Sequence, residues 1–337
     1  MKNSRKNEET ARKNILKKSE EVSGLKIEGY DFNEGIDYSR IIDSFSATGF
    51  QATNLAKSIE IINKMIEDKA TIFLGYTSNI VSSGLRDVIR YLVEHEKVDV
   101  CVTSGGGVEE DIIKCLGDFI LGDFRAKGEE LREKTINRIG NIFVPNSRYI
   151  KFEEFAMPVL EELYNEQKKR GKGILTYEIV WKLGEKINNK KSICYWAWKN
   201  KIKIHCPSIM DGSLGDMIYF FKYKHEDFAI DISEDTKELN DSTVGLERSG
   251  VIILGAGVVK HSVLNAHLYR NGADYAVFIN NAQEFDGSDA GAEPEEAVSW
   301  GKLTAKSLRV KVFGDATILF PLIVAKTFAL NQKINSS

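Results

Sequence analysis

The sequence is poor in the residues that mark several common protein classes. Its 337 residues include only four cysteines, five histidines and five prolines. The cysteines stand far apart and form no C-x-x-C pair, so we expect reduced thiols in a cytoplasmic protein. The histidines show no zinc-ligand spacing, so no metal site is expected. No apolar run approaches the roughly 18 residues that cross a membrane, and the charged N-terminus lacks the apolar stretch of a secretory signal.

Charge and motif content narrow the function classes further. The formal net charge of −3 does not suggest nucleic acid as a partner. The P-loop pattern G-x-x-x-x-G-K-[ST] is absent, which disfavours kinase or ATPase chemistry. Hydrophobic residues make up 42% of the chain and charged residues 28%, the ordinary balance of a globular protein with a large core.

The alternation of apolar runs predicts the fold. Beyond Gly29, short runs of β-forming residues alternate with longer helical stretches, and the short runs are apolar throughout, as in strands buried on both faces. This alternation predicts an α/β fold with a doubly wound, mostly parallel sheet (Rossmann-like) and helices on both faces. The expected strands are Thr71–Gly75, Val98–Thr103, Ile202–Cys206, Phe228–Ile232, Val251–Leu254, Tyr275–Ile279 and Val310–Phe313. The expected helices include Gln51–Glu67, Ser83–Glu96, Glu109–Leu121, Lys151–Lys168, Tyr177–Ile187 and Val259–Arg270.

No linker divides the chain, but the composition of its first 24 residues differs from that of the rest. No proline-rich or glycine-rich stretch divides it, so residues 25–330 are expected to form one α/β domain, followed by a tail of residues 331–337. Residues 1–24 are rich in Lys, Arg, Glu and Asn and have few apolar side chains. They fit either a solvated arm or a short amphipathic helix that docks on a neighbouring subunit.

Three glycine-rich turns follow expected strands. They are Gly75–Asn79, Thr103–Gly107 and Gly255–Gly257. In an open α/β sheet, ligands bind at the carboxyl ends of strands, where small residues let a dinucleotide approach the backbone and the next helix N-terminus favours its phosphates. None of the three is a complete G-x-G-x-x-G, so each alone is equally consistent with a tight turn. Together they favour a nucleotide site.

The most informative stretch runs from Glu284 to Lys302. Such an anionic loop suits a polycation, because each carboxylate can pair with an ammonium group. Pro294 suits the first position of a short helix, which Gly301 can end before Lys302. That lysine is either one more ion-pair partner or a nucleophile for imine chemistry. Six carboxylates fall within thirteen residues, with no Lys or Arg among them: Glu284, Asp286, Asp289, Glu293, Glu295 and Glu296.

Three further features each have a structural and a functional interpretation. Asp211–Asp216 is either a turn that begins a helix or a binding element for a ribose or a polyamine. Glu109–Asp111 opens an expected helix, where acidic residues complement the helix dipole, yet it also lies at the expected ligand edge. His261 is either structural or a general base at the start of a helix.

Taken together, five stretches resemble the deoxyhypusine synthase family, and the resemblance runs from about Gly29 to about Phe328. The Glu284–Lys302 stretch is highly specific, whereas the glycine turns are not. The matching stretches are Gly75–Asn79, Gly106–Asp111, Asp211–Asp216, Gly257–His261 and Glu284–Lys302.

The resemblance implies an NAD-dependent enzyme that acts on spermidine. A base matching His261 assists oxidation of the secondary amine, and 1,3-diaminopropane departs. The aminobutyl group is held as an imine on the lysine matching Lys302 and passes to one lysine of the eukaryotic translation initiation factor 5A precursor. Members of the family are homotetramers with sites between paired subunits. Their N-terminal helix plugs a neighbour's site entrance, which residues 1–24 would match.

The resemblance also implies the site residues, and none is a metal ligand. The catalytic residues match Lys302 and His261. Spermidine contacts match Glu109, Glu110, Asp216, His261, Asn265, Gly287, Ser288, Asp289, Glu296, Trp300 and Lys302. NAD contacts match Ser78, Asn79, Ile80, Val81, Ser82, Ser104, Gly105, Gly106, Glu110, Asp211, Ala256, Asn281, Ala282, Asp286, Asp315 and Ala316.

Several alternatives stay open at this point. Ala256, Asn281, Ala290 and Ser262 depart from the residues common in the family, which bears on NAD affinity and leaves the chemistry in place. The motifs do not separate this family from homospermidine synthase, which uses putrescine as the acceptor. A non-catalytic regulatory paralogue is a further alternative, although such paralogues tend to lose the nucleophile. The imine-forming lysine argues against a generic dehydrogenase.

Overall fold

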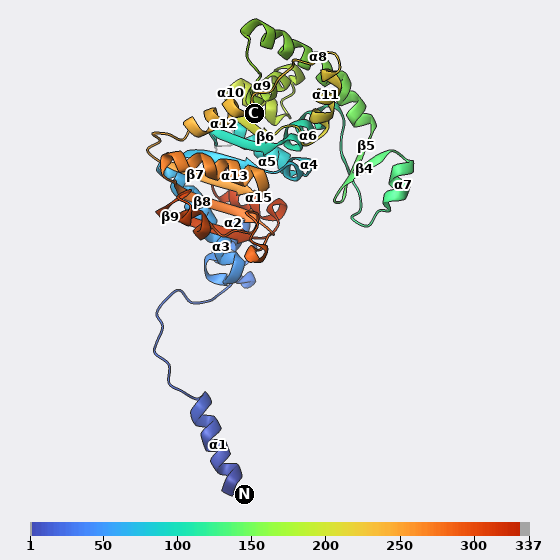
Figure 1. Cartoon of the computed structure of the whole chain (residues 1–337). Helices are drawn as coiled ribbons and strands as arrows, with labels where there is room; N and C mark the ends of the chain where they lie inside the picture. Colours follow the sequence, from blue (N-terminus) through green and yellow to red (C-terminus); the bar gives the residue numbers. More distant parts are fainter. Residues whose placement is uncertain (1, 331–337) are drawn as a thin grey trace.

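The computed structural model describes residues 2–330, which are built around a six-stranded parallel sheet (Figure 1). The strand order is β6-β2-β1-β7-β8-β9, so the chain adds strands outward in one direction from β1 and in the other direction from β7. The point where the order reverses, between β1 and β7, is where such sheets bind ligands. The strands are β1 (Thr71–Tyr76), β2 (Val100–Ser104), β6 (Lys203–Ser208), β7 (Ser249–Leu254), β8 (Ala273–Asn280) and β9 (Leu303–Phe313).

This architecture confirms the predicted doubly wound α/β fold, and it corrects one expected strand. Residues 228–232 form no strand: Ile230 makes a single isolated bridge with Ile174, and Ile232 already begins α12 (Ile232–Asp241). The side chain of Asp231 accepts a hydrogen bond from the backbone N–H of Glu234 and so caps this helix. An N-cap at this position starts a helix where the apolar run alone suggested a strand.

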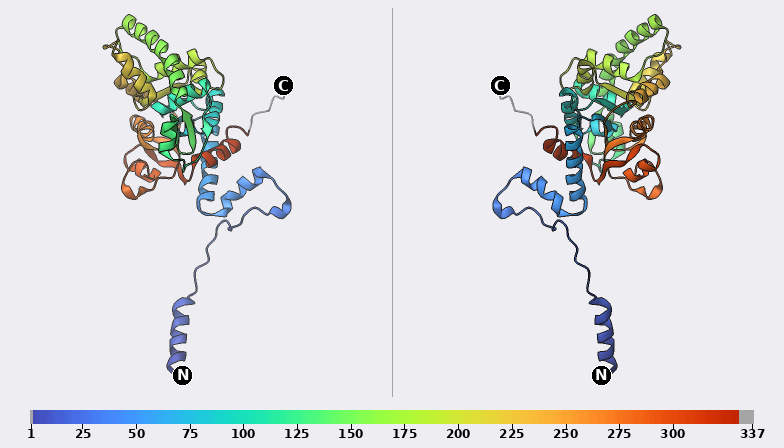
Figure 2. Two further views of the ribbon diagram at one scale, coloured as in Figure 1. Left: turned by 90° about the vertical axis from the view of Figure 1, so that its right-hand side faces the viewer. Right: turned by 90° about the vertical axis from the view of Figure 1, so that its left-hand side faces the viewer.

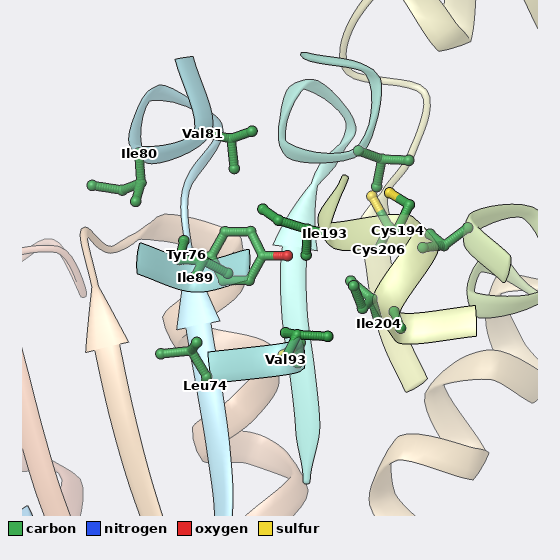
Figure 3. Close-up of a cluster of buried hydrophobic side chains, with 14 of the residues drawn as sticks. Leu74, Tyr76, Ile80, Val81, Ile89, Val93, Ile193, Cys194, Ile204 and Cys206 are labelled. Carbon is green, nitrogen blue, oxygen red and sulfur yellow. The ribbon is translucent and has the colours of Figure 1, made fainter. Parts of the chain in front are cut away.

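Side chains alternate between the two faces of the sheet. On one face, Phe73, Val251 and Phe278 pack with α12, α13 (Gly257–Ala266) and α14 (Pro294–Ser299). On the other face, Leu74 and Ile252 belong to a larger core, part of which is shown around Tyr76 in Figure 3. The helices of that core are α3 (Phe50–Glu67), α4 (Ser78–Ser82), α5 (Leu85–Glu94), α6 (Gly105–Leu116), α8 (Ser147–Arg170), α9 (Thr176–Ile187), α10 (Ile193–Asn200), α11 (Ser213–Lys222) and α15 (Ala316–Lys326).

Smaller elements extend from this body. A three-stranded antiparallel sheet, with the order β3-β5-β4, projects to one side together with α7 (Figure 1). Helix α6 ends at Leu116, and the first strand of this small sheet begins at Ile120. The expected helix Glu109–Leu121 therefore ends earlier than predicted. The bounds are β3 (Ile120–Leu121), α7 (Gly128–Glu133), β4 (Ile136–Ile139), β5 (Ile142–Pro145) and the short 3-10 helices η1 (Phe32–Glu34), η2 (His267–Arg270) and η3 (Glu284–Asp286).

The N-terminal region forms a helix that stands apart from the body. Helix α1 (Lys2–Ile15) is followed by an extended segment that leads to α2 (Tyr38–Thr48), which packs on α3 (Figures 1 and 2). The predicted tail, residues 331–337, lies outside the described residues. Within residues 2–330, no helix combines the length and the hydrophobicity needed to cross a membrane.

Candidate active site

A cavity of about 590 Å³ runs along α13 and is lined by residues of this helix, of α12 and of α14. Helix α13 begins after the carboxyl end of β7 and ends near His267, whose ring contacts Ser249 at the amino end of the same strand. The cavity therefore follows the strand direction down one face of the molecule. Seven of the predicted spermidine-site residues line it: His261, Asn265, Gly287, Asp289, Glu296, Trp300 and Lys302.

Lys302 lies in the wall of this cavity and is buried. As predicted, Pro294 occupies the first position of a short helix, and Gly301 follows that helix with a positive φ of 75°. The Lys302 backbone N–H then donates to the carbonyl of Ala297 at 2.9 Å. Its Nζ lies 5.8 Å from the ring centroid of Trp300, which is mostly exposed. The turn after α14 thus places Lys302 in the lining of the cavity.

The acidic loop keeps its shape through two buried lysines from other elements. Lys260, in α13, donates to the carbonyls of Asp289 at 2.5 Å and Ala292 at 2.9 Å. Lys311, in β9, donates to the carbonyl of Gly291 at 2.5 Å. Burial lowers the pKa of Lys260. The sequence analysis missed both residues, because nothing in the local pattern links them to a loop that contains no cation.

The carboxylates of this loop fall into two groups. Glu295 pairs with Arg309 at 3.0 Å, Glu293 pairs with Lys311 at 3.1 Å, and Asp286 accepts from Ser288 within its own turn. The hydrogen bonds from Ser288 lower the pKa of Asp286. Asp289 and Glu296 face the cavity and form no ion pair with a lysine or arginine of residues 2–330. Within the cavity, those two carboxylates are the ones free to bind a cation; the sixth acid of the loop, Glu284, is exposed and lies outside the cavity.

Asp289 and His261 form the polar centre of the cavity. Nε2 of His261 lies 3.5 Å from Oδ1 of Asp289, and Nδ1 lies 3.4 Å from the side-chain nitrogen of Asn265. The other carboxylate oxygen of Asp289 is buried and has no hydrogen-bond partner among the described residues. A buried carboxylate oxygen without a partner carries a large desolvation cost, which an ammonium group would relieve.

The carboxyl edge of the sheet collects the residues predicted to contact NAD. Because all six strands are parallel, the segments that follow them lie along one edge. A Cβ on Gly105 would lie 2.6 Å from the carbonyl oxygen of Asp211, and a Cβ on Gly106 would lie 2.7 Å from Cβ of Ser78. Only glycine permits this close packing. The predicted NAD residues follow β1 (Ser78–Ser82), β2 (Ser104–Gly106), β6 (Asp211), β7 (Ala256), β8 (Asn281, Ala282 and Asp286) and β9 (Asp315 and Ala316).

Glu109 and Glu110 lie at this edge and not in the cavity. Helix α6 begins at Gly105, so both belong to its second turn and are buried, and the helix-dipole interpretation of Glu109–Asp111 is wrong. Glu109 accepts from the backbone N–H of Leu214 at 2.6 Å and so caps α11. Burial raises the pKa of Glu109, and it raises the pKa of Glu110 to about 7 even though the Ser82 hydroxyl donates to Glu110.

Asp111 is a structural anchor. Its carboxylate pairs with Nε of Arg86 at 2.7 Å and accepts from the hydroxyl of Ser192 and the backbone N–H groups of Ile193 and Cys194. These partners cap α10 and tie it to α5 and α6. A buried charge with this many partners is typical of a fixed structural role.

Asp216 and Ser288 are the remaining predicted spermidine-site residues outside the cavity. Asp216 is exposed on α11, close in the chain to the Asp211 turn. Apart from Ser288, the predicted residues thus occupy two regions of the structure. The cavity set is His261, Asn265, Gly287, Asp289, Glu296, Trp300 and Lys302, and the carboxyl-edge set is Glu109, Glu110, Asp216 and the predicted NAD contacts.

A parallel sheet with glycine turns along its carboxyl edge, beside an acidic cavity that contains a buried lysine, is typical of α/β enzymes that bind their ligands near that edge. Comparisons with known proteins narrow this class. The family model described as deoxyhypusine synthase matches residues 40–327. The deoxyhypusine synthases of Senecio vernalis and Arabidopsis thaliana are each 48% identical to the chain, over 96% and 94% of its length and 95% and 94% of their own. The protein therefore belongs to the deoxyhypusine synthase family.

Solved structures agree with this assignment. A crystal structure described as that of a deoxyhypusine synthase from Entamoeba histolytica has 33% sequence identity and a TM-score of 0.68. The match covers 92% of this chain and 100% of that one. The fold and the family are therefore supported along nearly the same residues.

Proposed function

We propose that this protein transfers the 4-aminobutyl group of spermidine to one lysine of the eukaryotic translation initiation factor 5A precursor and releases 1,3-diaminopropane. The observation that carries this proposal is the juxtaposition, in one cavity, of a buried Lys302 with Asp289, whose Oδ2 is buried and has no hydrogen-bond partner among residues 2–330. A carboxylate of this kind selects an ammonium ligand, and the lysine supplies the amine that imine transfer needs.

His261 is the base of the first step. As a carbon–hydrogen bond of spermidine gives up a hydride, the adjacent secondary amine loses its proton to the imidazole, and a carbon–nitrogen double bond forms. Asp289 lies 3.5 Å from Nε2 of His261 and stabilises the imidazolium that results. Asn265 lies at the other ring nitrogen and orients the ring.

Lys302 then accepts the aminobutyl group. Its neutral amine attacks the imine carbon, the bond from that carbon to diaminopropane breaks, and a new imine links the aminobutyl carbon to Nζ. The acceptor lysine of the precursor displaces Lys302 in the same manner. Asp289 and Glu296 hold the free ammonium group throughout, and Trp300 covers the methylene groups.

The carboxyl edge fits NAD. Gly105 and Gly106 leave room for close backbone approach, and α4, α6, α13 and α15 all begin there, so their N-termini favour phosphate groups. Glu110 and Asp211 offer acceptors for ribose hydroxyls. When bound, NAD supplies a hydride acceptor for the oxidation and returns the hydride to the final imine, so the net reaction is a transfer.

Pairing of two subunits would complete the site. The cavity set and the carboxyl-edge set lie in different parts of one chain, which supports a homotetramer whose sites lie between paired subunits, with Asp216 contributed by the neighbour. Helix α1 stands apart from the body at the end of an extended segment (Figure 2), which supports a role for it at a neighbouring subunit's site entrance. The four cysteines are free thiols, three of them buried, which supports a cytoplasmic location.

The test is incubation with NAD and spermidine that is radiolabelled in its aminobutyl part, with and without the factor precursor. We expect label on the precursor, and we expect Lys302→Arg to reduce it at least a thousandfold. Lys306→Arg, which changes an exposed lysine four residues further on, is the matched control. Labelled homospermidine after addition of putrescine, with no label on the precursor, would assign the other activity. Neither product would indicate a regulatory subunit.

A further inference from the structure

We propose that His205, held by Asp235, supplies an additional hydrogen-bond acceptor for an ammonium group of the polyamine in the cavity. This inference rests on the proposed function and adds a contact that the predicted site does not contain. His205 lies in β6 and Asp235 in α12, and both line the same cavity as Asp289, Glu296 and Lys302.

Asp235 fixes the orientation and the proton of the His205 ring. One carboxylate oxygen of Asp235 accepts from the backbone N–H groups of Thr176 at 3.0 Å and Tyr177 at 3.4 Å. The other accepts from the Thr176 hydroxyl at 2.7 Å and lies 3.0 Å from Nδ1 of His205. A carboxylate surrounded by donors has no proton to give, so Nδ1 of the histidine carries the hydrogen.

The remaining ring nitrogen has nothing to bind within residues 2–330. In the neutral imidazole, Nε2 is then an acceptor with a free lone pair. His205 is 1% exposed, and Nε2 is buried without a hydrogen-bond partner. Buried polar atoms of this kind are rare in folded proteins, because leaving one unpaired costs as much as a hydrogen bond or more. The cavity therefore contains an acceptor that lacks a donor.

The charges around the cavity indicate which donor fits. Asp289, Glu293 and Glu296 line it, and Lys260, a cation that also lines it, already donates to two backbone carbonyls. An anionic ligand would be repelled by these carboxylates and could not donate a hydrogen bond to Nε2 of His205, so an anion does not fit this cavity. An ammonium group carries three N–H donors. A single carboxylate leaves some of them unpaired, and Nε2 of His205 can accept one.

Three substitutions separate this role from a purely structural one. His205→Asn places an amide nitrogen where Nδ1 was, so it keeps the link to Asp235 and loses Nε2. His205→Gln reaches the position of Nε2 with an amide oxygen and loses the link to Asp235. His205→Phe keeps the ring and loses both nitrogens. The measurements are the dissociation constant for spermidine, by calorimetry on the full-length protein with NADH in place of NAD so that spermidine is not oxidised, and the melting temperature without polyamine.

We expect His205→Asn and His205→Phe to weaken spermidine binding about tenfold, while His205→Gln stays within about threefold of the parent. If His205 serves only to hold Asp235, the order reverses: His205→Asn binds like the parent, and the other two variants lose thermal stability. That order would overturn the inference and leave the proposed function standing. Absence of spermidine binding to the parent protein would overturn both.

Two diamines that each lack one terminal amine of spermidine locate the contact. They are N-propyl-1,4-diaminobutane and N-butyl-1,3-diaminopropane. If Nε2 of His205 accepts from a terminal ammonium, the effect of His205→Asn disappears with the diamine that lacks that nitrogen and persists with the other. If it accepts from the central amine, the effect stays tenfold with both diamines and disappears with 1,8-diaminooctane, which lacks that amine. A loss of affinity that is equal for all four ligands would show a change of cavity shape and overturn the inference.

Discussion

The carboxyl edge of the sheet and the cavity along α13 acquire their shapes in different ways. At the edge, glycines bring backbone close to backbone: Gly105 packs against the carbonyl of Asp211, and helices begin directly after strands. In the cavity, Lys260 and Lys311 reach from distant elements and hold the carbonyls of an acidic loop. The edge is thus set by local chain geometry, whereas the cavity depends on tertiary contacts made by long side chains.

This difference separates the two proposed binding functions. A change at the edge should affect the cofactor and leave polyamine binding intact, and a change in the loop should do the reverse. The two regions are held by different contacts, since glycine packing shapes the edge and the ammonium groups of Lys260 and Lys311 hold the loop. Substitutions in each region therefore test whether the two regions act independently.

The largest effect on ligand binding is expected in the cavity, from Asp289→Asn. The substitution removes the charge of a carboxylate whose buried oxygen has no partner in the part of the chain that the structure describes, so KM for spermidine should rise about a hundredfold. Steady-state kinetics with saturating NAD measure it, and the dissociation constant for NAD should stay the same. Glu284→Gln, which neutralises an exposed residue of the same loop outside the cavity, is the control. Equal effects of the two substitutions would mean that only the total loop charge matters.

The corresponding change at the edge is Gly105→Ala. The added Cβ would lie 2.6 Å from the carbonyl oxygen of Asp211, so the backbone must shift where the cofactor is proposed to bind. Such overpacking costs about 1–3 kcal/mol, and we expect NAD to bind about thirtyfold more weakly. Fluorescence titration with NADH measures the change. Gly128→Ala adds a Cβ with nothing within 4 Å and should bind like the parent. Loss of spermidine affinity in Gly105→Ala would show that the regions are coupled.

The pH dependence of protein stability tests whether Glu110 is buried at the carboxyl edge. Burial raises its pKa from 4.5 to about 7 in the folded protein. Between these values the folded state retains a proton that the unfolded state has released, so Glu110 makes stability fall as pH rises from about 4.5 to 7. Glu110→Gln removes this dependence. The variant should gain about 3 kcal/mol relative to the parent between pH 4.5 and pH 8, measured by urea unfolding. A constant difference would contradict the raised pKa.

The sequence predicted most of the fold because its signals are local. Strands such as β7 are apolar runs bounded by turn residues, and Pro294 and Gly301 mark both ends of a helix. The residues that hold the site in place were not predictable in this way. Lys260, Lys311 and His205 look like ordinary members of α13, β9 and β6 until the fold brings them to the loop and to Asp235.

The smallest expected effect concerns the lysines that hold the loop. Lys260→Met keeps the volume and removes the ammonium that binds the carbonyls of Asp289 and Ala292, while Lys311 still holds Gly291. The loop should loosen without collapsing, so KM for spermidine should rise about fivefold with NAD affinity unchanged, in keeping with the loss of one or two hydrogen bonds. Lys326→Met, which removes an ion pair with Asp43 far from the cavity, is the control for loss of charge. If Lys260→Met instead abolished NAD binding, the loop and the sheet edge would be one structural unit, and the separation between the two regions would fail.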